Sequence, residues 1–264
     1  MPLVVSEAIV LHGFDYLESS RIIRLVTRDA GMRSAIAKGA RKSRRRFGSG
    51  LDLFAQGTAS LHSKPGRELD ILSGFEDVRT RSDLGSDLAR FAGAETIAEI
   101  ALRFGRDGAD APLFDAVATA LDDLASSSGD DAREATLAGA WQIVAALGFG
   151  PAVSECAECG SRIADEEAAL FTHSAGGVLC RRCEKLSPGG RKLPASARTA
   201  IAGWMSGRRL TLTDVDARAH QRLLREFLGY HLDDGPPLRA FDVWEAEIYT
   251  APNRTDDPVA TPAR

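Results

Sequence analysis

The sequence lacks the motifs of several common enzyme classes. It contains no G-x4-G-K-[ST] phosphate loop, no G-x-G-x-x-G dinucleotide fingerprint, no G-x-S-x-G nucleophile elbow and no H-E-x-x-H metal motif. The five histidines, at positions 12, 62, 173, 220 and 231, do not have the spacing of metal ligands. We therefore expect a protein that is not an enzyme, and a P-loop ATPase in particular is unsupported.

The sequence also predicts neither a secretory leader nor a membrane span. Met1–His12 has no basic region followed by an apolar run. The uncharged stretch Ala135–Val153 is 19 residues long, but it contains Gln142, several glycines and mostly small side chains. It predicts a buried helix that ends at Gly148 and turns at Pro151, not a span of the bilayer. We expect a cytoplasmic protein with no membrane contact.

Composition is that of a folded chain, and its charge is unevenly distributed. The 264 residues are 44% hydrophobic and 27% charged, which suits one or two domains and excludes a wholly disordered chain. The net charge of −4 does not by itself suggest nucleic acid as a partner. However, the first 82 residues hold 14 basic and 9 acidic residues, a net of +5, whereas the remainder holds 19 and 28, a net of −9.

Most of the basic residues of the first third fall in one run. Arg21–Arg46 contains ten Lys or Arg and a single acid, Asp29. A solvated loop is the ordinary explanation of a charge run, but this density is typical of phosphate binding. Phe14, Phe47 and Phe54 could stack on bases or belong to the core. The predicted DNA-binding residues are Arg21, Arg24, Arg33, Lys38, Arg41, Lys42, Arg44, Arg45 and Arg46.

Residues 1–80 show the alternation of short β-strands, with Gly and Pro at the breaks. Five such strands predict a small closed barrel, because closure removes exposed sheet edges. An OB-fold and an SH3-like barrel fit this pattern almost equally well. The expected strands are Leu3–His12, Arg21–Arg28, Met32–Lys38, Leu51–His62 and Glu68–Asp77.

From Asp83 onward apolar residues recur every three or four positions, as on one face of a helix. The pattern predicts a first helix from Leu84, a second that begins near Pro112, and a third that carries Leu137 and Trp141. Two further helices are expected at Ser196–Met205 and Asp214–Leu232. Residues 250–264, rich in Pro, Asp and Thr, are expected to be disordered.

Four cysteines form two C-x2-C pairs separated by 20 residues: Cys156 with Cys159, and Cys180 with Cys183. This spacing is typical of a tetrahedral zinc site, and a hairpin of Ala169–His173 with Val178–Leu179 would bring the pairs together. Two disulfides or four unrelated buried thiols are the alternatives. A chain without a leader favours a reducing compartment, so we predict one structural Zn²⁺ in a zinc ribbon at residues 154–185. His173 is not needed as a ligand, and Arg181 and Arg182 would offset the charge of the site.

In order along the chain, several segments resemble the RecO family of bacterial recombination mediators. The segments are Glu18–Ile22, Ala37–Arg41, Phe91–Glu99, Leu147–Pro151 leading into the four cysteines, and Leu223–Ala240. The stretch Leu147-Gly-Phe-Gly-Pro151 with both C-x2-C pairs is the most specific of them. Only the final tail lies outside the resemblance.

The resemblance implies an α+β protein with an N-terminal five-stranded OB-fold barrel, followed by a helical domain that contains a four-cysteine zinc ribbon. The expected domains are residues 1–80, which bind DNA, and residues 81–249. It further implies binding of single- and double-stranded DNA, annealing of complementary strands and help in loading recombinase onto coated strands. The implied partners are RecR and the C-terminal tail of single-strand-binding protein, at the nucleoid. Two other functions stay open: an RNA-binding factor of the translation apparatus, and a purely protein-binding adaptor.

Overall fold

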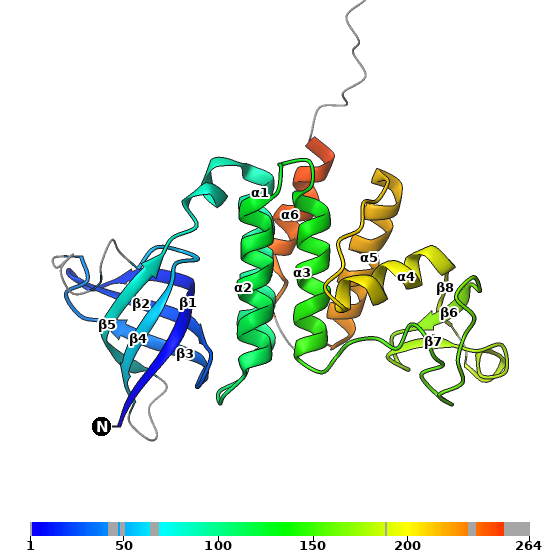
Figure 1. Cartoon of the computed structure of the whole chain (residues 1–264), viewed down its shortest axis with the longest axis horizontal. Helices are drawn as coiled ribbons and strands as arrows, with labels where there is room; N and C mark the ends of the chain where they lie inside the picture. Colours follow the sequence, from blue (N-terminus) through cyan, green and yellow to red (C-terminus); the bar gives the residue numbers. More distant parts are fainter. Residues whose placement is uncertain are drawn as a thin grey trace, which may run out of the picture.

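The computed structural model describes residues 2–41, 47, 51–63, 69–187, 189–231 and 236–250. The chain forms three parts arranged in a row: a β-barrel at one end, a group of helices in the middle and a small sheet at the other end (Figure 1). Among the described residues, no helix is long and apolar enough to cross a membrane. The described part of the basic run, residues 21–41, and the cysteine pairs therefore lie at opposite ends of the molecule.

The N-terminal part is a closed barrel with the strand order β1-β2-β3-β5-β4. Strands β3 and β5 are parallel, and the other neighbouring pairs are antiparallel. This arrangement confirms the expected five-stranded OB-fold. The strands are β1 (Leu3–Tyr16), β2 (Ser20–Thr27), β3 (Gly31–Ala37), β4 (Gln56–His62) and β5 (Asp70–Arg79).

The fourth strand begins later than expected. Strand β4 starts at Gln56, because residues 51–55 turn back on the barrel and Phe54 adopts a positive φ of 63°. Phe47 and Phe54 are each only 2% exposed, so both are core residues and are not available for stacking on bases. Phe47 lies inside the barrel, and Phe54 lies between the barrel and the helices.

The expected helices are all present, and one more follows them. Asp87 and Asp110 cap the first two α-helices by accepting hydrogen bonds from backbone N–H groups. Gly148 follows the third helix with a positive φ of 82°, as expected of a residue that ends a helix. The helical elements are η1 (Ser82–Ser86), α1 (Leu88–Phe104), α2 (Ala111–Ser126), α3 (Ala132–Ala146), α4 (Ala195–Met205), α5 (Asp214–His231) and α6 (Arg239–Thr250).

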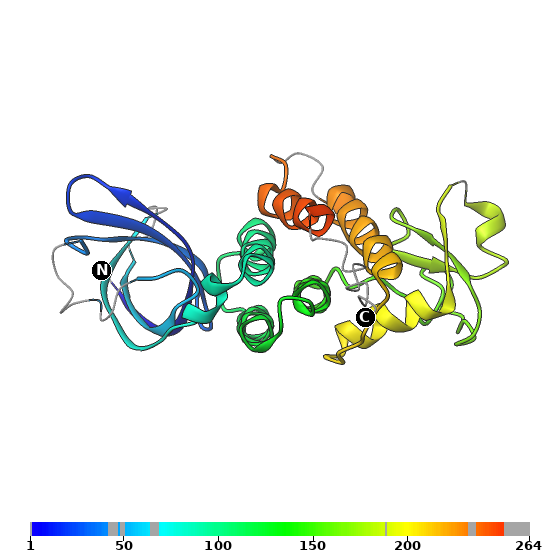
Figure 2. The same ribbon diagram turned by 90° about the horizontal axis from the view of Figure 1, so that it is seen from above.

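The last helix, α6, was not predicted from the sequence. It lies against α1, as Figures 1 and 2 show, and buries Phe241 and Trp244 almost completely. The carboxylate of Glu99 on α1 accepts hydrogen bonds from the backbone N–H groups of residues 239, 240 and 241, at 2.8, 3.0 and 3.1 Å. Helix α6 ends at Thr250, the first residue of the predicted tail, and residues 251–264 lie outside the described residues.

The barrel has its own interior core, and its outer face shares a second hydrophobic core with the helices. Residues from the outer face of the barrel, among them Ile9, Val26 and Met32, belong to the same buried cluster as α1 and α2. Gly31 closes the contact: its φ is +68°, and a Cβ there would lie 2.1 Å from the Gly108 carbonyl oxygen. The barrel is therefore fixed against the helices and does not hang from a linker.

At the other end, a three-stranded sheet of order β7-β6-β8 forms the ribbon. Strands β6 and β7 match the expected hairpin, whereas β8 was not predicted. Arg198 of α4 holds the ribbon to the helices, because its guanidinium donates to the carbonyl oxygens of Val153, Ile163, Ala164 and Glu167. The ribbon elements are β6 (Ala169–Thr172), β7 (Gly177–Leu179), η2 (Glu184–Leu186) and β8 (Arg191–Leu193).

Candidate metal centre and nucleic-acid interface

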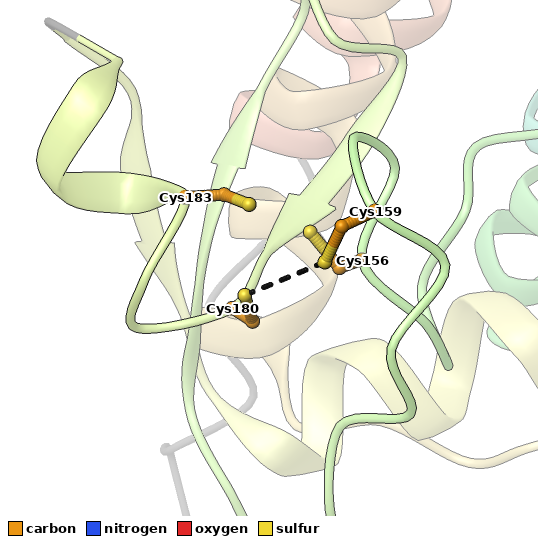
Figure 3. Close-up of side chains that lie close together, drawn as sticks. All are labelled: Cys156, Cys159, Cys180 and Cys183. Atoms are coloured by element: carbon orange, nitrogen blue, oxygen red, sulfur yellow. Dashed lines mark hydrogen bonds between the residues drawn. The ribbon is translucent and has the colours of Figure 1, made fainter.

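The two C-x2-C pairs lie on two tight turns that face each other. In the first turn, the N–H of Gly160 donates to the Cys156 carbonyl at 2.8 Å, and Gly160 takes a positive φ of 68°. In the second, the N–H of Glu184 donates to the Cys180 carbonyl at 2.9 Å. The hairpin of β6 and β7 separates the turns in sequence and brings them together in space (Figure 3).

The four sulfur atoms have the spacing of a tetrahedral metal site. All four Sγ atoms lie within 4.8 Å of one another, and Cys159 Sγ lies 3.8 Å from Cys180 Sγ. Tetrahedral Zn²⁺ with Zn–S bonds of about 2.3 Å places its sulfurs about 3.8 Å apart. None of the four forms a disulfide. The two pairs therefore form one candidate metal cluster, in which four thiolates would leave no position for a substrate.

Hydrogen bonds and burial shift the pKa values of the thiols in opposite directions. The hydroxyl and backbone of Ser161 lower the pKa of Cys159 to about 6, and Ser161 Oγ lies 3.1 Å from its sulfur. Burial and hydrogen bonds to the neighbouring thiols raise the pKa of Cys183 to about 12. Four thiols this close together cannot all be ionised without a counter-charge, because the thiolates repel one another. A divalent cation would supply that charge and stabilise the four thiolates.

Side chains near the cluster have different roles. The guanidinium of Arg182 hydrogen-bonds Cys159 and Cys183, which raises its own pKa and offsets the charge of the thiolates. Arg181 instead pairs with Glu167 at 2.7 Å. His173 lies 3.6 Å from the Glu226 carboxylate and edge-on to Phe171, away from the sulfurs. Ser161 was missed from the sequence, although its place two residues after a ligand is a usable signal.

The predicted DNA-binding residues differ in how far they reach into solvent. Lys38 and Arg41 are exposed where the chain leaves β3. Arg41 is held loosely, with a contact of 3.5 Å to Asp15 and one of 3.4 Å to the Glu18 carbonyl. Four further candidates, Lys42, Arg44, Arg45 and Arg46, lie outside the described residues.

The remaining three candidates are half-buried on β2 and β3. Arg21 donates to the Leu51 carbonyl at 3.0 Å, and Arg24 lies over the barrel–helix contact, 3.4 Å from the Leu102 carbonyl. Arg33 pairs with Asp70 at 2.7 Å, and the Asp70 side chain is only 4% exposed. The structure thus brings Lys38 and Arg41 together at one end of the barrel, with Arg21 beneath them and Arg24 and Arg33 nearer the helices.

Comparison with known families covers both the barrel and the helical part. The family described as "Recombination protein O N terminal" matches residues 1–81, and "Recombination protein O C terminal" matches residues 85–240. The chain belongs to the RecO family. The RecO resemblance drawn from the cysteine pairs and the Ala37–Arg41 segment is therefore confirmed, and with it a place among DNA repair proteins.

Several curated RecO proteins are similar over most of their length. "DNA repair protein RecO" of Anaeromyxobacter sp. (strain Fw109-5) is 32% identical over 240 residues, which cover 88% of this chain and 93% of the relative. The protein of the same name from Rubrobacter xylanophilus is 34% identical over 189 residues, 71% of this chain and 74% of the relative. The printed names describe DNA repair and name no catalysed reaction.

Proposed function

We propose that this RecO-family protein is a recombination mediator that binds single- and double-stranded DNA, anneals complementary strands and helps to load recombinase onto strands coated by single-strand-binding protein. The observation that carries the proposal is the exposed pair Lys38 and Arg41, at the start of the densest basic segment of an otherwise acidic chain. No covalent chemistry is required. Pairing of two complementary strands is favourable in free energy, but it is slow because their charged backbones repel each other. A basic surface lowers that repulsion and raises the local concentration of the strands.

We also propose that the four cysteines hold one structural Zn²⁺. An all-sulfur ligand set with this spacing suits zinc, whose closed four-coordinate sites stabilise small folds and do not catalyse reactions. When bound, the ion would supply folding free energy to the ribbon. The protein's own contribution is to hold the thiols on two turns and to balance their charge with Arg182.

Residues 1–80 would form the DNA-binding part, and residues 81–249 would carry the protein contacts. The proposed partners are RecR and the C-terminal tail of single-strand-binding protein, and the helical part would bind the tail. Such partners would bring the barrel to coated DNA, in the cytoplasm at the nucleoid. The acidic balance of the helical part would keep DNA from its partner-binding surfaces.

The deciding experiment is annealing of complementary strands coated with single-strand-binding protein, with and without the full-length chain. We expect the chain to accelerate annealing without ATP. A variant with Lys38, Arg41 and Lys42 all changed to Glu should lose both DNA binding and annealing. If about six cations contact phosphates, log K should fall with log salt at a slope of about −5 on duplex and −4 on single strands.

A matched control changes Lys185, Arg208 and Arg222 to Glu. These residues are exposed on the helical and ribbon parts, and the control alters the net charge equally. Loss of DNA binding in the control to the same degree would show that total charge matters and not the barrel surface. Tighter, salt-dependent binding of structured RNA than of DNA would instead support the RNA-binding alternative.

A further inference from the structure

A row of exposed rings lies on β1, which precedes the basic run in sequence and pairs with β2. His12, Phe14 and Tyr16 alternate along the strand, so their side chains lie on one face, about 6.8 Å apart. Phe14 is 47% exposed and Tyr16 42%, although phenylalanine is usually buried. The ring centroids of His12 and Phe14 lie 6.0 Å apart. We call these three residues the ring row.

The ring row is on the outside of the barrel. A bulge between Val10 and His12 shifts the register, after which His12 pairs with Arg24 and Phe14 pairs with Ile22. The next residue of β2, Ile23, belongs to the barrel interior, so its neighbours Ile22 and Arg24 face outward. The bulge thus places the ring row on the outer face of the barrel. Leu11 and Val26 lie on the same face, nearer the helices.

The other face of the same hairpin is polar. Asp15 pairs with Arg21 across β1 and β2, and their side chains form a contact of 3.6 Å. Leu17, at the hairpin turn, is 74% exposed and adopts a positive φ of 53°, an uncommon conformation for a bulky residue. The hairpin therefore extends from the barrel with one polar and one aromatic face, and its end points away from the helices (Figure 2).

Positive charge borders the ring row at both ends. Toward the helices, His12 and Arg24 line a groove of about 500 Å³ that also contains Arg103 and Arg239. At the other end, Lys38 follows β3 directly after Ala37, the partner of Arg21.

Two acids, Glu95 and Glu99, share the groove with these arginines. The carboxylate of Glu99 accepts the N–H groups at the start of α6. Burial and the charge of Glu99 raise the pKa of Glu95. The groove therefore holds three arginines against two carboxylates, and Asp15 on the other face of the hairpin contacts Arg21.

We propose that the ring row is a stacking platform for the unpaired bases of a single strand, with Arg24 and Lys38 at its edges to hold the phosphates. Every base has a π-face, so a row of rings binds single strands with little sequence preference. Bases of a duplex are already stacked on each other and cannot use the platform. The inference rests on the proposed DNA binding and adds to it the residues that distinguish single strands from duplex.

The test compares full-length wild type with the double variant Phe14→Ala, Tyr16→Ala on a single-stranded oligonucleotide and on a duplex of the same sequence. Each ring removed should weaken single-strand binding by about 5-fold or more, while duplex affinity stays within 2-fold. The slope of log K against log salt should not change, since no phosphate contact is lost. The conservative pair Phe14→Tyr, Tyr16→Phe should keep wild-type affinity.

A matched control is Leu3→Ala, Val5→Ala, two residues of the same strand that are 56% and 55% exposed at its other end. A second readout is the variant Phe14→Trp: its added fluorescence should be quenched by a normal single strand and not by an abasic one. The three native tryptophans are buried and form a constant background.

The outcomes separate the inference from the proposed function. If the wild-type protein does not bind DNA, or if its DNA binding does not weaken with salt, the proposed function fails. If wild type binds but the alanine pair binds single strands equally well, or loses single-strand and duplex binding together, the stacking platform is refuted while DNA binding stands. If the alanine pair loses only binding to a protein partner, the rings form a protein contact and the inference is wrong.

Discussion

Replacement of Arg198 by Met should loosen the ribbon and lower the stability of the whole protein. The Arg198 side chain is 3% exposed, and it donates to the carbonyls of Val153 at 2.7 Å and Ala164 at 3.0 Å, among others. A hydrogen bond to a charged group contributes ~1.5–3 kcal/mol. Methionine would fill much of the volume but would leave these buried carbonyl oxygens without donors.

The cost of burying the guanidinium offsets part of this gain, so the expected loss is smaller than the sum of its hydrogen bonds. A buried acceptor left without its donor typically costs about 1–3 kcal/mol. We expect Arg198→Met to lower the free energy of unfolding by this amount, and Arg198→Lys by less, because one ammonium cannot reach carbonyls on both sides. The assay is urea unfolding followed by circular dichroism, together with the rate of metal release to a chromogenic chelator.

The control is Arg222→Met, an exposed arginine of α5, which should unfold like wild type. If Arg198→Met is within 1 kcal/mol of wild type and releases metal no faster, the carbonyl contacts do not hold the ribbon and the reasoning is wrong.

Three further predictions concern the metal centre, a buried histidine and the last helix. Cys156→Ser should release the metal and lower the melting temperature without changing the salt slope of DNA binding; atomic absorption that finds no metal in the wild type would contradict it. Burial lowers the pKa of His220 to about 4 from 6.5, so protons bind preferentially to the unfolded chain. Stability should be full above pH 6.5 and fall by about 3 kcal/mol as the pH drops toward 4. His220→Leu should flatten that fall, and equal pH profiles for the two proteins would refute the assignment. Glu99→Gln should weaken the cap of α6 by about 1 kcal/mol and speed amide exchange in α6, while exchange in α3 stays unchanged.

The fold could be predicted from the sequence wherever local pattern and global packing agree. The alternation of β1 to β3, the Asp caps of α1 and α2, and Gly148 at the end of α3 are all local signals. The choice of an OB-fold over an SH3-like barrel was not local, because it depends on the parallel pairing of β3 with β5. Helix α6 was missed since, among the residues whose side chains are described, only Phe241 and Trp244 on the helix and Leu238 just before it mark its apolar face. The signal becomes clear only when α6 is packed against α1.

The metal centre and the basic surface also differ in how far the sequence could predict them. The cysteine cluster was predictable, because two C-x2-C turns joined by a hairpin leave few other arrangements. The basic residues were found by composition, but composition could not tell exposed Lys38 from Arg33, whose partner Asp70 is 37 residues away. The ring row was also hidden, because the bulge at residues 10–12 changes which side of β1 faces outward.

The pairing of α6 with α1 has a consequence for synthesis of the chain on the ribosome. The barrel closes once β5 is complete at residue 79, so it can fold while the rest is still being made. Helix α1 follows at once, and α2 and α3 cover part of it, yet the helix that covers its remaining apolar face is almost the last segment to emerge. A nascent chain would therefore carry that surface uncovered through about 135 residues of elongation, several seconds at ordinary rates. Chains that end before residue 239 should keep this apolar surface of α1 exposed, and chaperones and proteases should therefore recognise them.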